Sequence, residues 1–328
     1  MLELKQLLVR TLVTGMLAVF ASPSLAQEYP NKPITWIVAY PAGGGSDNAV
    51  RLLAADLSQE LKQPVVVENR PGAATIIGAE IAAKAAPNGY TIFSADNGTL
   101  IFNPLLYKKL PYDPARDFIP VALYAKFPLL LVVNPKSLPV DSVQNLIALS
   151  KKRADPIPYG SPGLGSPQHL AMELFSERTD TKFTNVPYKG TAPLTTDLLG
   201  EHIGLSFLGV ATGLPLVKSN RLRALAVAEP QRLVSMPEVP TFAEVGIPGV
   251  VANAWQGVVV PKGTPMPIVD RLNQALVKIL KSPTLIARFN EMGIEPISST
   301  PAEMKALMDS ESRLWGDVIR KRGITLEK

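Results

Sequence analysis

The amino-acid sequence predicts an α/β fold with two lobes, each built on a doubly wound sheet, joined by a hinge that the chain crosses twice. Nearly continuous apolar runs alternate with amphipathic segments, which is typical of parallel strands connected by helices. The alternation stops at a proline-rich stretch, residues 109–120, and then starts again. Hydrophobic residues make up 46% of the 328 residues, which is enough to bury two cores.

The first unit opens with residues 34–40, ITWIVAY, a nearly continuous apolar run rich in β-branched and aromatic residues. Such a run predicts a strand that is buried on both faces. Apolar residues then recur at helical spacing over 50–61. Two further strands, expected at 64–69 and 91–95, enclose a helix over 75–86. We therefore expect a parallel sheet with helices on both faces.

The second unit repeats this scheme. Its expected strands are residues 128–135, 157–160, 203–209 and 221–228, and its expected helices are 140–152, 168–177 and 192–200. A late strand, 255–261, precedes three helices that begin near Pro267, Pro283 and Pro301, because proline is tolerated in the first turn of a helix. The second unit already has its strands, so we assign these late elements to the first lobe. The expected lobes are 27–125 with 252–328, and 126–251.

The first 26 residues have the layout of a secretory signal peptide. Lys5 and Arg10 precede an apolar segment, Thr11 to Phe20, and the small residues Ser24 and Ala26 follow it. The apolar segment is shorter than the roughly 20 residues that a spanning helix needs. We expect cleavage after about Ala26 and export to the periplasm.

Composition excludes several classes of function. The chain has no cysteine and two histidines, which excludes disulfides, thiolate metal sites and cysteine nucleophiles and leaves few parts for a catalytic triad. The glycine-rich loops do not match the dinucleotide, P-loop or nucleophile-elbow patterns. The net charge is +5 and the basic residues are scattered, so we expect no nucleic-acid partner but an easier approach for anions. We predict a protein that is not an enzyme and has no cofactor or metal.

Four loops follow strands and lead into or towards helices, and they are rich in glycine or small polar residues. They span residues 40–47, 161–166, 94–99 and 207–213. Ligands of open α/β sheets bind at the carboxyl ends of the strands, where helix N-termini offer free N–H groups to an anion. None of the four loops contains Arg or Lys. Backbone and hydroxyl donors without a guanidinium favour a carboxylate over a phosphate.

Several stretches resemble one protein family. Residues 31–91, the motif YGSPGLGSPQHLAMELF at 159–175, VPYKGTAPLTTDLLG at 186–200 and WQGVVVPKGTP at 255–265 are similar to the Bug/TctC periplasmic solute-binding proteins of tripartite tricarboxylate transporters. The resemblance covers almost the whole mature chain. It implies a monomeric, type II-like Venus-flytrap fold that closes on a small organic acid. It also implies a ligand carboxylate held by the first glycine loop.

The resemblance carries ligand-binding positions over to the four loops. They are Tyr40, Pro41, Ala42, Gly43, Gly44, Gly45, Ser46, Asp47, Ser94, Asp96, Asn97, Ser161, Gly165, Ser166, Phe207, Gly209 and Thr212. We add His169, one turn into the helix that follows the second of these loops, as a further candidate. Other roles stay open for some of them: Asp47 can cap its helix, Asp96 and Asn97 can make an Asx turn, and His169 can be a packing residue. Leu208 stands where many members have a polar residue. This departure lowers the expectation of an amino-acid ligand and favours an aromatic or medium-chain carboxylate lying against Phe207 and Leu208.

The expected function is therefore capture of a small mono- or dicarboxylate for delivery to the membrane subunits of a transporter. The same fold could instead present its ligand to a membrane sensor kinase, and only the partner distinguishes the two. An exported hydrolase is disfavoured because no nucleophile–base pair is apparent.

Overall fold

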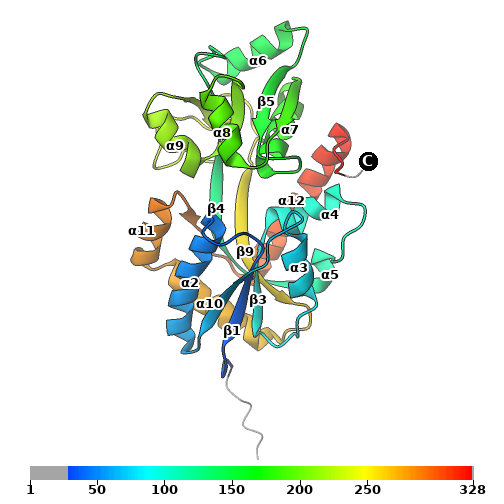
Figure 1. The fold of residues 1–328 in the computed structure, drawn as a ribbon, viewed down its shortest axis with the longest axis vertical. Coiled ribbons are helices and arrows are strands. Elements are labelled where there is room, and N and C mark those ends of the chain that lie inside the picture. Colours follow the sequence, from blue (N-terminus) through cyan, green and yellow to red (C-terminus); the bar gives the residue numbers. More distant parts are fainter. Residues whose placement is uncertain (1–28, 327–328) are drawn as a thin grey trace, which may run out of the picture.

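The computed structural model describes residues 29–326, so the predicted signal peptide lies outside the described residues. The predicted α/β fold with two lobes is confirmed, and Figure 1 shows the lobes one above the other with β4 and β9 running between them. The two expected sheets are continuous, because β4 (Phe118–Val133) is 16 residues long and belongs to both. Its first part pairs with β9 (Asn253–Pro261), and its last five residues pair with strands of the upper lobe.

The lower lobe contains three parallel strands, β1 (Ile34–Val38), β2 (Val65–Asn69) and β3 (Thr91–Asp96), in the order β2-β1-β3. β9 runs antiparallel to β3 and joins them to β4. The helices that connect or follow these strands include α2 (Gly45–Leu61), α3 (Ile76–Ala83), α10 (Met266–Leu280) and α11 (Pro283–Glu291). α2 and α10 pack on one face over a core that includes Trp36 and Tyr124.

The upper lobe is built on β5 (Ile157–Ser161), β6 (Phe183–Pro187), β7 (Leu205–Gly209) and β8 (Arg223–Val227), with β7 and β8 antiparallel to the end of β4. Its helices are α6 (Val143–Lys152), α7 (Pro167–Thr179), α8 (Thr191–Leu199) and α9 (Val210–Lys218). Each follows a strand and leads into the next. The sequence patterns predicted α6, α7 and α8 but not α9, whose first residues lie in the expected 207–213 loop.

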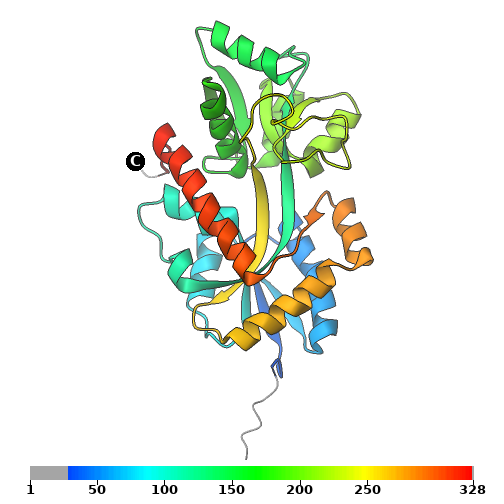
Figure 2. The ribbon, with the colours of Figure 1, turned by 180° about the vertical axis from the view of Figure 1, so that it is seen from behind.

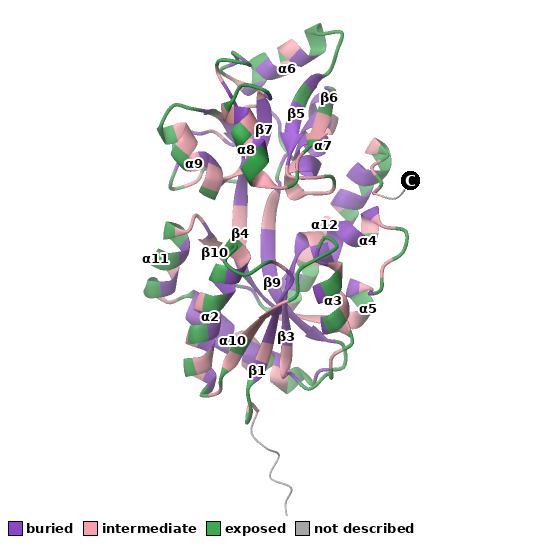
Figure 3. Cartoon of the chain, in the orientation of Figure 1, coloured by how far each residue is buried: buried purple, intermediate pink, exposed green. Residues whose placement is uncertain are grey.

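Two strands cross between the lobes, as predicted, and a helix spans the same gap. β4 and β9 stay at least half buried where they pass between the lobes (Figure 3). The 22-residue helix α12 (Pro301–Arg322) starts with a capping box, Thr300 and Glu303, in the lower lobe. Figure 2 shows it running from the base of β9 to the side of the upper lobe, where Arg322 Nε donates to Glu173 Oε2 of α7 at 2.6 Å. The lobe boundaries expected at 125/126 and 251/252 fall within β4 and just before β9.

Several short elements of the structure were not predicted from the sequence. They are the π-helical turn Gly98–Phe102, α4 (Asn103–Leu106), α5 (Pro114–Asp117), α9 and β10 (Glu295–Pro296). The stretch expected to be a connection, 109–120, contains α5 and the first residues of β4. Proline cannot donate a ladder hydrogen bond, yet Pro120 and Pro128 both lie within β4. The pairing of β4 with β9 shifts register just after Pro120, and Pro128 is the last residue of β4 that pairs with β9. Within residues 29–326 no helix is long and apolar enough to cross a membrane.

We predict that Gly78→Val destabilises the protein. A Cβ at Gly78 would lie 2.8 Å from Ala39 Cβ and 3.0 Å from the Arg70 carbonyl oxygen, so α3 would have to move away from the end of β1. Overpacking of this kind should lower the free energy of unfolding by about 1–3 kcal/mol, measured by urea denaturation. The control is Ile81→Val on the exposed face of the same helix, with an expected change below about 0.5 kcal/mol. Equal effects of the two substitutions would contradict the close packing of α3.

Candidate anion-binding site

The start of α2 has no side-chain cap. Gly44 is the N-cap residue, and the helix begins at Gly45 directly after the exposed loop that follows β1. The N–H groups of Gly45, Ser46 and Asp47 belong to the first turn, where an α-helix provides no acceptor. Figure 1 shows this end of α2 on the side of the lower lobe nearest the upper lobe. The aligned peptide dipoles add positive potential at the same point, so this end of the helix is suited to an anion.

The Asp47 side chain is buried beneath the loop and is hydrogen-bonded to it. Only 1% of Asp47 is exposed, and its two carboxylate oxygens accept from three partners: the Gly43 N–H at 2.8 Å, Arg51 Nε at 2.9 Å and Asn69 Nδ2 at 2.8 Å. Burial raises the pKa of Asp47, but the three donors outweigh it and hold the pKa below its usual value. Arg51 also neutralises the carboxylate, which removes most of its repulsion for an incoming anion.

Ser46 is the partly exposed hydroxyl of this loop. Its Oγ accepts a hydrogen bond from Gln256 Nε2 on β9 at 2.5 Å. Gln256 Oε1 lies 2.8 Å from the Tyr124 hydroxyl on β4, and that hydroxyl lies 2.9 Å from Ser94 Oγ on β3. Trp36 Nε1 donates to Ser94 Oγ at 2.8 Å. The first glycine loop is thus connected through buried side chains to both strands that cross between the lobes.

Asp96 and Asn97, at the end of β3, are held by their neighbours. Asp96 Oδ1 accepts from Thr99 N at 2.7 Å and from Thr99 Oγ1 at 2.6 Å, and its Oδ2 accepts from the Tyr40 hydroxyl. This is the local turn role that the sequence left open. Burial and the nearby Asp96 raise the pKa of Tyr40 well above its usual value, so the phenol stays a donor. Asn97 Nδ2 donates to the Asn253 carbonyl of β9 at 2.8 Å.

A further loop of the lower lobe was missed by the sequence reasoning. Residues 72–75 lead into α3, and Ala73, Ala74 and Thr75 all have positive φ angles, of 45°, 50° and 74°. Three non-glycine residues in the left-handed region are unusual, and such strain is concentrated at functional sites. Thr75 Oγ1 lies 2.7 Å from Thr99 Oγ1, next to the turn made by Asp96. The dipeptide Pro71–Gly72, between the second strand and the helix that follows it, is a sequence signal for a turn at this point.

The expected second-lobe loop, Ser161 to Ser166, uses most of its donors internally. Ser166 Oγ caps α7 by accepting from His169 N at 3.2 Å, and Gly165 N donates to His169 Nδ1 at 3.1 Å. Pro167 at the first helical position has no N–H. Burial lowers the pKa of His169, opposed by Glu173 at 4.0 Å, which keeps the ring neutral and able to accept. His169 therefore orders this loop from inside, and Ser161 is fully buried.

Two other helices of the upper lobe start without a side-chain cap. The N-cap residues are Gly190 for α8 and Gly209 for α9, and Thr212 lies in the first turn of α9. Exposed Lys189 stands just before Gly190, and none of the four sequence-predicted loops included it. Phe207 is fully buried against Phe242, with ring centroids 6.0 Å apart, and Leu208 lies in a second core cluster. Their contact with a ligand stays a prediction, since neither side chain reaches a surface in this conformation.

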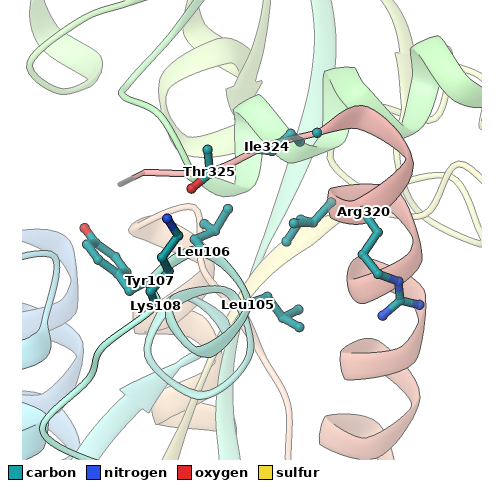
Figure 4. A pocket seen from close by; sticks show the side chains of 9 residues that line it. Leu105, Leu106, Tyr107, Lys108, Arg320, Ile324 and Thr325 are labelled. Carbon is teal, nitrogen blue, oxygen red and sulfur yellow. The ribbon is translucent and has the colours of Figure 1, made fainter. Parts of the chain in front are cut away.

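Two shallow hollows in the surface of the described residues lie away from these helix starts. One, of about 440 Å³, lies between α4 and the end of α12, where Leu105, Leu106, Lys108 and Ile324 line it (Figure 4). The other, of about 430 Å³, lies between α2 and the end of α10. Within residues 29–326 no group of three or more His, Asp and Glu side chains is placed to hold a metal ion. The uncapped helix starts are the features suited to a small anion.

Comparison with known proteins gives one consistent family. A family model described as the tripartite tricarboxylate transporter family receptor matches residues 49–324. The chain is 38% identical over 308 residues to protein BugT of Bordetella pertussis, and the alignment covers 94% of each chain.

Solved structures agree with this result. An R. palustris protein determined with adipate shares 37% identity with a TM-score of 0.79, and the match covers 91% of this chain and 99% of that one. MatC from Rhodopseudomonas palustris, determined with bound malate, shares 29% identity with a TM-score of 0.74 over 89% of this chain and 100% of its own.

We predict that Asp47→Ala loosens the first glycine loop and lowers the free energy of unfolding by about 2–3 kcal/mol at pH 7, because three donors lose a charged acceptor. The pKa of Asp47 is lower in the folded chain than in the unfolded chain. Its contribution is therefore complete above the unfolded value of about 4 and is lost as the pH falls through the folded value.

The measurement is urea denaturation of wild type and variant between pH 3 and 8. The difference between them should be constant above pH 5 and shrink below pH 4. Asp309→Ala serves as the control, because that carboxylate pairs with Lys305 on the exposed face of α12, and it should change stability by less than about 0.5 kcal/mol. A difference for Asp47→Ala that does not depend on pH would contradict the network.

Proposed function

This chain belongs to the receptor family of the tripartite tricarboxylate transporters, and we propose that it captures a medium-chain or aromatic mono- or dicarboxylate in the periplasm for delivery to the membrane subunits of such a transporter. The family is one of solute receptors and not of enzymes. The membrane subunits would recognise the receptor in its ligand-bound, closed form, since a ligand that contacts both lobes shifts the equilibrium between open and closed arrangements.

The observation that carries this proposal is the uncapped start of α2. The exposed glycines 43–45 leave the backbone open to a ligand, and the first-turn N–H groups supply donors without a competing side-chain acceptor. The nearby carboxylate, Asp47, is already neutralised by Arg51. A carboxylate satisfies such donors with its four acceptor sites and needs no cation.

The finer ligand class is supported by the distribution of donors over the two lobes. The starts of α8 and α9 also lack side-chain caps, so a dicarboxylate of sufficient length could engage one lobe with each end. Adipate, named for a relative that is 37% identical, is a six-carbon dicarboxylate of this kind. A tricarboxylate such as citrate is disfavoured because the four sequence-predicted loops contain no Arg or Lys, and Lys189 beside the start of α8 can balance only one of three charges.

A thermal-shift screen tests the class. The panel contains adipate, malate, benzoate and citrate, and the expected result is stabilisation by adipate or benzoate in preference to citrate. Mass spectrometry of the denatured, freshly purified protein identifies any acid that is carried through purification. Stabilisation by citrate alone would contradict the ligand class, and stabilisation by none of a broad panel of organic acids would contradict the function.

We predict that Gly44→Val abolishes binding of the stabilising acid, with a loss of at least about 100-fold in affinity, while the fold is kept. The backbone at Gly44 is extended, with φ −75° and ψ 168°, so its dihedral angles allow valine. A Cβ there would lie 3.3 Å from the Pro41 carbonyl oxygen, which requires a shift of a few tenths of an ångström that the exposed loop can absorb, and the side chain would hinder approach to the first-turn N–H groups. Isothermal titration calorimetry measures the loss. Ala115→Val adds the same branched bulk at an exposed position of α5 and should bind as wild type. Survival of binding within a few-fold in Gly44→Val would remove α2 from the site.

A further inference from the structure

Five side chains from five different elements form one hydrogen-bonded chain behind the start of α2. In order they are Trp36 on β1, Ser94 on β3, Tyr124 on β4, Gln256 on β9 and Ser46 on α2, with successive contacts of 2.8, 2.9, 2.8 and 2.5 Å. The first four are buried, and Ser46 is partly exposed. The chain therefore runs from the core of the lower lobe to the surface at the candidate anion site.

Trp36, at the buried end of this chain, and the Gln256 amide together set the direction of the hydrogen bonds between them. Trp36 Nε1–H can only donate, so Ser94 Oγ accepts there and its own proton is available to Tyr124. Gln256 Oε1 can only accept, and it lies 2.8 Å from the Tyr124 oxygen, so the single Tyr124 proton goes to it. The 2.9 Å contact between Tyr124 and Ser94 is then made by the Ser94 hydroxyl, which has a proton of its own to donate to the Tyr124 oxygen. Burial raises the pKa of Tyr124 above its usual value of 10, which keeps this proton in place at any physiological pH.

The last link leaves the Ser46 proton without a partner inside the chain. Gln256 Nε2 donates to Ser46 Oγ, so Ser46 receives a proton from the protein and still has its own to give. The neighbouring first-turn N–H groups are donors as well. In this arrangement the Ser46 proton and the N–H groups of Gly45, Ser46 and Asp47 are all donors, whereas the Gly43 N–H is already taken by Asp47.

We propose that Tyr124 and Gln256 are positioning residues that turn the Ser46 hydroxyl proton toward the ligand, so that the site binds an ionised carboxylate and rejects its primary amide. An amide nitrogen carries hydrogens of its own and would face donors with no acceptor to receive them. This inference rests on the proposed function and adds to it the chemical basis of selection at one end of the ligand.

The structure also explains why the selection depends on residues that are remote from the ligand. If the Gln256 amide turned over, its oxygen would face Ser46 and take the serine proton. Ser46 would then face the ligand as an acceptor and repel a carboxylate. The buried end of the chain opposes this, because Trp36 and Tyr124 would then both donate to Ser94 Oγ, and the buried Ser94 proton would have no acceptor within the chain. Tyr124 transmits this preference, since it accepts the Ser94 proton and donates its own to Gln256 Oε1.

The test is a double-mutant cycle on Tyr124→Phe and Ser46→Ala, with affinities for adipate and for adipamide measured by calorimetry. Each single variant should bind adipate roughly tenfold more weakly, the effect of one lost hydrogen bond to a charged group. Tyr124→Phe should also narrow the preference for adipate over adipamide. In the Ser46→Ala background Tyr124→Phe should have no further effect, because it acts only through the missing hydroxyl.

Tyr29→Phe is the matched control. Its hydroxyl donates to the Gly89 carbonyl at 2.7 Å, away from the chain of five residues, so this variant should keep wild-type affinity and preference. If Tyr124→Phe does not fold, Gln256→Met replaces it, since that unbranched side chain removes the same link. Melting temperatures identify variants that have lost the fold.

These measurements distinguish a failure of the proposed function from a failure of the inference about Tyr124 and Gln256. Wild-type protein that binds no acid of the panel contradicts the proposed function and this inference with it. If another acid replaces adipate as the stabilising ligand, that acid and its primary amide are the probes. Two results overturn the inference alone, provided that the wild-type protein binds an acid. One is that Tyr124→Phe lowers the affinity equally with Ser46 present and with Ser46→Ala. The other is that Tyr124→Phe leaves the preference for the acid over its amide unchanged.

Discussion

The candidate anion site depends on one set of hydrogen-bond donors, the N–H groups in the first turn of α2, which have no side-chain cap. A helix leaves these groups free of partners within the helix, and a side-chain cap can satisfy them, as Ser166 does for α7 and Ser142 for α6. At α2 the cap position is Gly44, and the one nearby carboxylate, Asp47, is turned into the loop by Gly43, Arg51 and Asn69. The loop is therefore held rigid while its donors stay available to a ligand.

The same region is mechanically connected to the hinge. Gln256 and Tyr124 belong to β9 and β4, the two strands that cross between the lobes, and they contact the α2 loop through Ser46. A buried ion pair between Lys126 of β4 and Glu229 of the upper lobe, at 3.1 Å, lies farther along the same crossing. The proposed ligand contacts at α2 are thus connected to the two strands that cross between the lobes, as closure on a ligand requires.

The sequence predicted the features that depend on local patterns. Buried parallel strands, amphipathic helices and glycine-rich turns after strands have period and composition signals, and these located the lobes' sheets and the Gly43–Gly45 loop. It did not predict contacts between distant segments: the pairing of Ser46 with Gln256 spans 210 residues. Nor did it show that Phe207 packs inward on Phe242, because a strand's period does not say which face meets a ligand. Pro71–Gly72 marked a turn before α3, but the positive φ angles of Ala73, Ala74 and Thr75 were not predictable, since these residue types rarely adopt them.

The most direct test of the central claim is a crystal structure of the protein with the acid that stabilises it most. The account predicts carboxylate oxygens within about 3.2 Å of the backbone nitrogens at the start of α2 and of the Ser46 hydroxyl, with Asp47 still bound to Arg51. A carboxylate held instead by lysine or arginine side chains, with the first turn of α2 left to solvent, would contradict it.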